Sequence, residues 1–203
     1  MDAGIAVPRK LEGDKAQRII AAMRESVATR GAAGSTFDHV AREAGVSRGL
    51  LHYYFGSKER LLVEVVRQDA NKRIQAMDGR LAGAGSVDEV LQALVIVLEE
   101  FLGEPGSQAV IYEMLSASRH SDEIRAELAE LYRRWREHMA AALREKEREG
   151  VVSLQAEPEA VASILTALGD GFGIQVITDP DWTRDAAFEL GVRLARGMLG
   201  AAA

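Results

Sequence analysis

Residues 36–61 hold two short helical segments joined by a glycine turn, and this pattern allows few folds. The first segment places apolar residues at positions i, i+3, i+4 and i+7, which is the spacing of one helix face: Phe37, Val40, Ala41 and Ala44. Gly45 is suited to the left-handed turn that ends a helix. A second helix is predicted to begin only two residues later, at Ser47. The chain must therefore turn sharply here between two helices.

The charges at the starts of two predicted helices are unusual. Arg48 follows the predicted N-cap Ser47, and Lys58 follows the predicted N-cap Ser57. A helix N-terminus favours negative charge, so helix stability alone would select the opposite sign. A bound phosphate would reverse that preference, because the free amide groups and the cation would share one anion. Both cations are therefore predicted to contact DNA, the alternative being that they are solvated surface charges.

The remaining sequence predicts an all-α fold, because apolar spacings of three and four residues recur along the chain and strand-like alternation is rare. A first helix is predicted from Asp14 to about Arg30, and a long connector helix from Ser57 to the glycines at 83–85. The later helices are predicted at 87–103, closed by Pro105, and at 108–119, 122–149, 158–178 and 183–199.

Composition limits the class of protein. The formal net charge of −6 argues against a nucleic-acid partner, but its distribution does not. Up to Lys72 the chain has 12 basic and 9 acidic residues, a net charge of +3, and the remainder has a net charge of −9. DNA contacts are therefore expected in the first third. The absence of cysteine excludes disulfides and thiolate metal sites. Because the sequence shows no pattern of an export signal or membrane anchor, a cytoplasmic protein without membrane contact is expected.

The two short helices and their glycine turn form the helix-turn-helix pattern, in which the second helix enters the major groove of DNA. Over about residues 14–66 the sequence resembles the tetracycline-repressor (TetR) family, and the resemblance rests on these residues: Thr36, Val40-Ala41, Ala44-Gly45-Val46-Ser47, Gly49, Leu51, Tyr54-Phe55 and Ser57-Lys58-Glu59-Arg60-Leu61. The resemblance implies a dimeric transcriptional repressor that a ligand releases from a two-fold symmetric operator in double-stranded DNA.

Roles carried over from the family give seven DNA-binding residues: Thr36, Ser47, Arg48, Gly49, His52, Tyr53 and Lys58. Arg48 is the predicted base reader, since arginine can bond guanine bidentately. Leu50 and His52 depart from the family's usual residues, which leaves the operator sequence open. The spacing of Leu51 and Phe55 favours core packing over DNA contact.

The predicted helix at 183–199 is apolar around most of its circumference, and a monomer could cover only part of that surface. Alanines and glycines keep faces of the helix at 158–178 slim, so that a second helix can approach closely. A second copy would cover the rest through a four-helix interface about a two-fold axis. The residues predicted at this interface are Val161, Ile164, Leu165, Leu168, Leu190, Leu194 and Met198. The alternative is that both helices are central in a monomeric core.

Aromatic, methionine and polar residues between the connector and the closing helices suit a cavity for a small apolar or amphipathic effector. The predicted ligand contacts are Tyr112, Trp135, His138, Met139, Phe172 and Gln175, with ordinary core packing as the alternative reading. No cofactor and no metal site is predicted.

The predicted organisation is a flexible arm at 1–13, a helix-turn-helix DNA-binding domain at 14–60 and a helical ligand-binding and dimerisation domain at 61–203. Two other functions stay open. An enzyme would have to use His120, His138, Glu113 and Asp170, which have no diagnostic spacing. A structural DNA-binding protein without a ligand would need only the basic first third.

Overall fold

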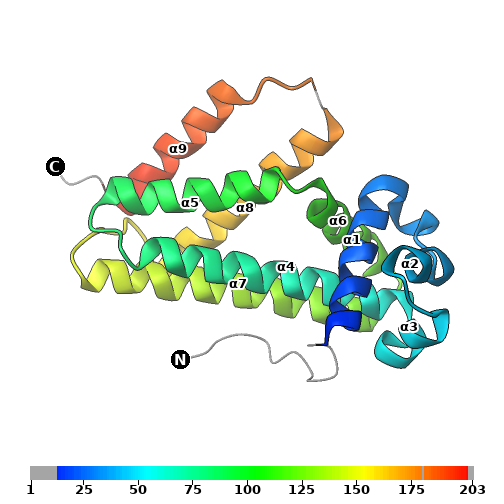
Figure 1. The fold of residues 1–203 in the computed structure, drawn as a ribbon. Coiled ribbons are helices and arrows are strands. Elements are labelled where there is room, and N and C mark those ends of the chain that lie inside the picture. The colour runs from blue at the N-terminus through cyan, green and yellow to red at the C-terminus, as the bar shows by residue number, and fades with distance from the viewer. Residues whose placement is uncertain (1–12, 180, 201–203) are drawn as a thin grey trace. The chain divides into compact units, whose positions relative to one another are not determined.

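The computed structural model describes residues 13–179 and 181–200, and every regular element in these ranges is a helix. The predicted arm at 1–13 lies outside the described residues except for Gly13. The helices, coloured along the chain in Figure 1, are α1 (Asp14–Gly34), α2 (Phe37–Ala44), α3 (Arg48–Phe55), α4 (Lys58–Leu81), α5 (Val87–Leu102), α6 (Pro105–Ala117), α7 (Asp122–Arg148), α8 (Pro158–Thr178) and α9 (Asp185–Leu199).

The helices form two compact units. The first runs through Lys72 and also contains Glu104–Leu131, so it includes α1, α2, α3, α6 and the beginnings of α4 and α7. Its core forms where α1 packs against α2 and α6. The large apolar side chains that are fully buried here include Ile19, Ile20, Met23, Leu51 and Leu61. This unit positions the helix-turn-helix.

The second unit contains Arg73–Gly103 and residues from Tyr132 onward. Its α5 packs against both α8 and α9. The core combines residues from five helices, with Met77, Val90, Leu143, Ala162 and Leu199 all almost fully buried. The helices α4 and α7 each contribute residues to both units.

Most helix boundaries agree with the prediction, and three differ from it. α6 begins at Pro105 rather than at Gln108, because proline suits the first turn of a helix, where its missing N–H is not needed. α1 extends to Gly34, but its backbone breaks just after the predicted end at about Arg30, since Gly31 has φ 68°. α9 begins at Asp185, two residues later than predicted.

The two compact units do not coincide with the predicted division at residue 60, because α6 packs on α1 within the first unit. The assignment of DNA binding to 14–60 and of ligand binding and dimerisation to 61–203 remains a prediction about function.

Candidate nucleic-acid interface and effector region

The turn between α2 and α3 is built by local interactions that the sequence predicts. The Thr36 side chain caps α2 by accepting a hydrogen bond from the His39 backbone N–H at 3.3 Å. Gly45 ends α2 in the left-handed conformation, with φ 64° and ψ 41°. The buried Leu51 and Phe55 attach α3 to the core, as their spacing predicted. One face of α3 is thereby fixed inward and the other is left to solvent.

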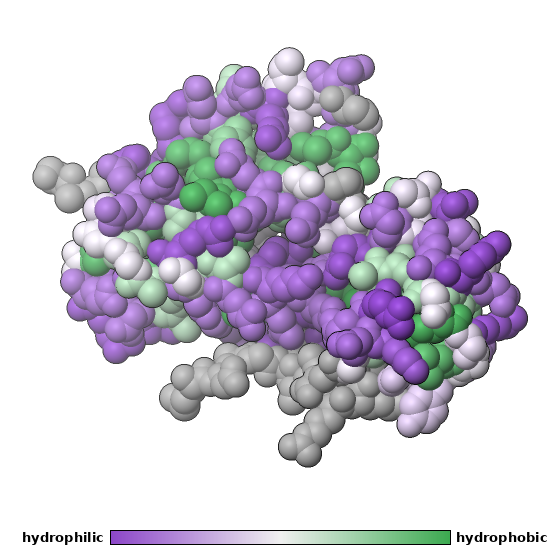
Figure 2. All heavy atoms as spheres, viewed as in Figure 1, coloured by the Kyte–Doolittle hydropathy of each residue, from purple (hydrophilic) through white to green (hydrophobic). Residues whose placement is uncertain are grey.

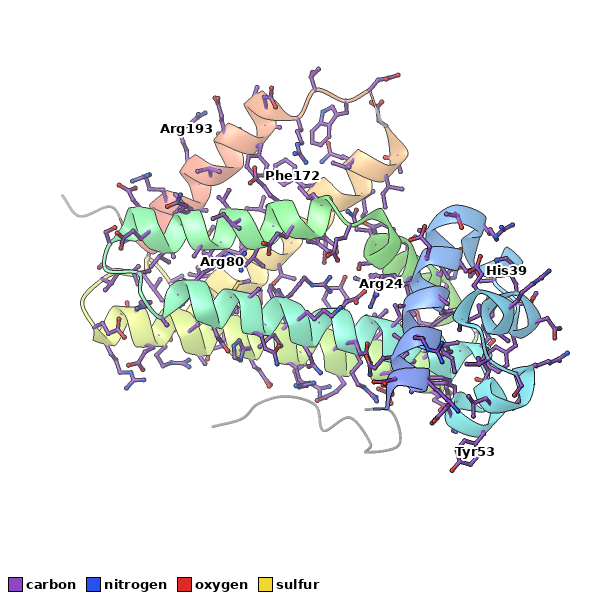
Figure 3. The ribbon with its side chains drawn as sticks, in the orientation of Figure 1. Arg24, His39, Tyr53, Arg80, Phe172 and Arg193 are labelled. Atoms are coloured by element: carbon purple, nitrogen blue, oxygen red, sulfur yellow. The ribbon has the colours of Figure 1, made fainter. Side chains whose placement is uncertain are left out.

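The outward face of α3 carries several of the predicted DNA contacts. Ser47 precedes the helix, but its side chain makes no capping hydrogen bond, and the residue is exposed. Tyr53 is 65% exposed, and Figure 3 shows it pointing away from the body of the unit. A Cβ added at Gly49 would meet only Ser47 Oγ, at 4.0 Å, so packing within the chain does not require glycine there. Close approach of another molecule to this end of α3 would require glycine there.

Arg48 is held by two neighbours. Its Nη1 donates to both carboxylate oxygens of Asp38, at 3.0 and 3.3 Å, and its Nε lies 3.5 Å from His52 Nε2. His52 Nδ1 lies 3.2 Å from the Gly56 carbonyl oxygen, while the ring packs edge-on against Phe37. Asp38 was not among the predicted functional residues. Its only sequence signal was an acidic residue in the first turn of α2, which is common at helix N-termini.

Lys58 has a different environment from the one predicted for a free phosphate-binding cation. Ser57 caps α4 as predicted, by accepting a hydrogen bond from the Arg60 backbone N–H at 3.2 Å. However, Lys58 is half-buried, and its Nζ donates to the Ala32 carbonyl oxygen at 2.6 Å. The amine therefore bonds a backbone carbonyl just beyond the Gly31 break of α1. Its role in phosphate binding remains a prediction.

Buried polar contacts connect α1 with α4 and α6 inside the first unit. Arg24 on α1 forms an ion pair with Asp69 on α4, whose side chain is 4% exposed. Ser107 Oγ on α6 donates to Asp69 at 2.7 Å, and Glu113 on the same helix accepts a hydrogen bond from the Ala32 N–H at 3.3 Å. The three helices are thus joined by directional bonds as well as by apolar packing.

The predicted ligand contacts are divided between the two units. Tyr112 belongs to the first unit, and the other five belong to the second. His138 lies 2.6 Å from Asp78, Met139 is in the hydrophobic core, and Phe172 stacks on Trp182 with ring centroids 5.9 Å apart. Trp135 is half-buried, whereas Gln175 is exposed and donates to the Gly171 carbonyl oxygen at 3.2 Å. Their contact with a ligand stays a prediction.

The second unit also contains a partly buried polar cluster. Burial raises the pKa of Asp170 on α8, while a hydrogen bond with Tyr132 and the charge of Arg73 act in the opposite direction. The Arg73 guanidinium lies over the Phe101 ring, 4.9 Å from its centroid. Four helices of this unit thus place polar and aromatic groups together in an otherwise apolar region.

Large apolar side chains are exposed on α8 and α9, and Figure 2 shows green spheres over both helices. Ile164 is 52% exposed, Leu190 49% and Leu194 53%, while Leu165, Leu168 and Met198 are half-buried. The interface prediction for Val161 is corrected. Val161 is 2% exposed and packs in this unit's own core, so it cannot lie on an open interface. By length and composition α8 could cross a membrane, but core helices of soluble proteins pass the same test.

Comparisons with known proteins identify the family. Residues 19–65 match the family model for bacterial regulatory proteins of the tetR family, and residues 88–200 match the model for the C-terminal region of BetI-type transcriptional repressors. This chain belongs to the TetR family. It is therefore a transcriptional regulator with a DNA-binding helix-turn-helix, and the predicted fold class is confirmed. The family is not an enzyme class.

Relatives and solved structures agree with this TetR-family assignment. The HTH-type transcriptional regulator BetI of Rhizobium meliloti is 32% identical over 141 residues, which are 68% of this chain and 65% of the relative. A regulator from Saccharomonospora viridis, solved in complex with choline, has a TM-score of 0.69 and 25% identity, covering 89% of this chain and 93% of its own. FadR of Bacillus subtilis, solved with stearoyl-CoA, has a TM-score of 0.73 and 19% identity, covering 92% and 99% respectively.

Proposed function

We propose that this TetR-family member is a cytoplasmic homodimeric repressor that a small apolar or amphipathic molecule releases from a two-fold symmetric DNA operator. The observation that carries the DNA-binding part is the outward face of α3, where Ser47, Arg48, His52 and Tyr53 are all exposed while Leu51 and Phe55 fix the helix to the core. An exposed arginine at the start of such a helix is placed to read base edges in the major groove.

The exposed apolar residues of α8 and α9 support the homodimer. Ile164, Leu190 and Leu194 would each remove much of their surface from water against the same helices of a second copy. A dimer places two α3 helices on one face of DNA, and the half-sites are then expected about one helical turn apart, or a multiple of it.

The second unit supports the proposed effector site. It combines the Arg73, Tyr132 and Asp170 cluster with the stacked rings of Phe172 and Trp182. Small-molecule sites commonly join apolar walls with a few polar groups, which suits an amphipathic ligand. The complexes of similar regulators with choline and stearoyl-CoA make these two molecules reasonable first probes.

Release requires that a change at α6 or α4 reaches the helix-turn-helix. The Asp69 carboxylate joins Arg24 of α1 to Ser107 of α6, and Ala32 of α1 is bonded by both Glu113 and Lys58. A shift of α6 or α4 would therefore move α1 and the helices that pack on it.

The DNA-binding part predicts a selective loss in Arg48→Ala. Selection of bound fragments from random DNA should yield a two-fold symmetric site with the wild-type protein. Arg48→Ala should lose about 1–3 kcal/mol of discrimination at one base pair in each half-site, because a bidentate arginine contact is removed. Fluorescence anisotropy with single-base-pair variants of the selected site measures this. Equal binding of the wild type to all sequences would rule out the proposed operator recognition.

The release mechanism predicts reciprocal coupling. An effector that lowers operator affinity must itself bind more weakly when operator is saturating, by the same factor, which is typically about 5–150-fold. Choline and stearoyl-CoA are tested first by calorimetric titration with and without operator. A probe that binds with the same affinity in both titrations would show that its binding is not linked to DNA release.

A further inference from the structure

The contacts of Arg48 point to a second residue that controls base recognition. Arg48 and Asp38 are 57% and 64% exposed, so their ion pair is worth at most about 1 kcal/mol of stability. The pair nevertheless has a defined geometry, because both oxygens of one carboxylate accept from the same nitrogen, Nη1. Because the pair holds the side chain expected to read DNA, its effect is expected on recognition rather than on stability.

His52 restrains the same guanidinium from another direction. Its Nδ1 faces the Gly56 carbonyl oxygen, which can only accept, so Nδ1 carries the hydrogen and donates. In the neutral ring Nε2 is then an acceptor, and it faces Arg48 Nε at 3.5 Å. His52 is itself held by the ring of Phe37, at a centroid distance of 4.9 Å. Helix α2 thus supplies both the carboxylate that bonds Arg48 and the ring that orients His52.

These contacts leave a donor available. Arg48 bonds other described residues through Nε and Nη1 and not through Nη2. A guanidinium held in this way presents Nη2 without first losing rotamer freedom, which reduces the entropy cost of binding. The carboxylate also repels phosphate, so it disfavours the alternative in which Arg48 leaves the base edge for the DNA backbone.

We propose that Asp38 is a specificity-determining residue, which positions Arg48 to bond a base rather than a phosphate. The proposal rests on the proposed operator recognition by α3. The ion pair then has no stabilising role. Asp38 lowers the affinity for non-specific DNA and raises the ratio of specific to non-specific DNA affinity. A carboxylate that served only the N-terminus of α2 would instead affect helix stability and leave base preference unchanged.

The test compares wild type, Asp38→Asn and Asp38→Glu on the selected operator, its single-base-pair variants and random-sequence DNA. Asp38→Asn should bind random DNA more tightly than the wild type. Its discrimination at the base pair read by Arg48 should fall at least about threefold, which is part of the effect expected for one bidentate contact. Asp38→Glu should restore discrimination in part, because it keeps the charge. The melting temperature should change little in either variant.

Two controls make the outcome specific. Glu59→Gln removes the same charge from the exposed first turn of α4 and should raise affinity for all sequences without changing base preference. In an Arg48→Ala background, Asp38→Asn should no longer affect base preference. If Asp38→Asn changes the affinity for all sequences equally, as Glu59→Gln is expected to do, the positioning role is wrong. If the wild type has no base preference, operator recognition itself fails instead.

Discussion

Leu194→Glu should convert the proposed dimer of about 44 kDa, twice the 22.0 kDa chain, to a monomer. Leu194 on α9 is 53% exposed, and at the proposed interface a glutamate would be removed from water without a cationic partner. Because two linked recognition helices bind far better than one, operator affinity should fall by about 10²- to 10⁴-fold. Sedimentation equilibrium and anisotropy titration measure the two effects.

Leu115→Glu is the matched control for this substitution. Leu115 on α6 is also exposed, at 42%, but it lies outside the proposed interface. The control should keep both the dimer and operator affinity. A monomeric wild type, or a Leu194→Glu protein that remains dimeric and binds operator normally, would contradict the proposed use of α8 and α9. The same exposed residues would then need another explanation.

Asp69→Ala should reduce the free energy of unfolding by about 3–5 kcal/mol, which is the usual cost of breaking a buried ion pair. The carboxylate accepts from Arg24 and from Ser107, and its loss would leave the Arg24 guanidinium without its partner in a largely buried site. Ser107 Oγ could turn its single hydrogen toward Glu104, 3.0 Å away, but among the residues that the structure describes Arg24 bonds only Asp69. Urea unfolding followed by circular dichroism measures the loss.

Asp78→Ala provides the comparison for Asp69→Ala on the same helix. Asp78 pairs with His138, but its side chain is 52% exposed, so removing it should cost no more than about 1 kcal/mol. Asp69→Asn keeps the side-chain volume and an oxygen acceptor. Its loss of unfolding free energy should therefore lie between those of Asp69→Ala and Asp78→Ala. If Asp69→Ala and Asp78→Ala destabilise the protein equally, burial does not decide the strength of the Asp69 contacts.

The helices and their ends could be predicted from the sequence because their causes are local. The cap at Thr36, the left-handed turn at Gly45 and the inward positions of Leu51 and Phe55 depend on residues only a few positions away. The same local pattern carried the TetR resemblance, which the family models confirm. Pro105 was misassigned because proline suits both the end of one helix and the first turn of the next.

Only the tertiary structure decided which groups meet across helices. Lys58 bonds the carbonyl of a residue 26 positions earlier, and Arg48 bonds a carboxylate ten positions earlier on another helix. Val161 and Ile164 were indistinguishable as apolar residues of α8, yet one is buried and the other half-exposed. A helix that is apolar around most of its circumference has no periodicity to rank its faces, so packing against neighbouring helices decides which face remains open.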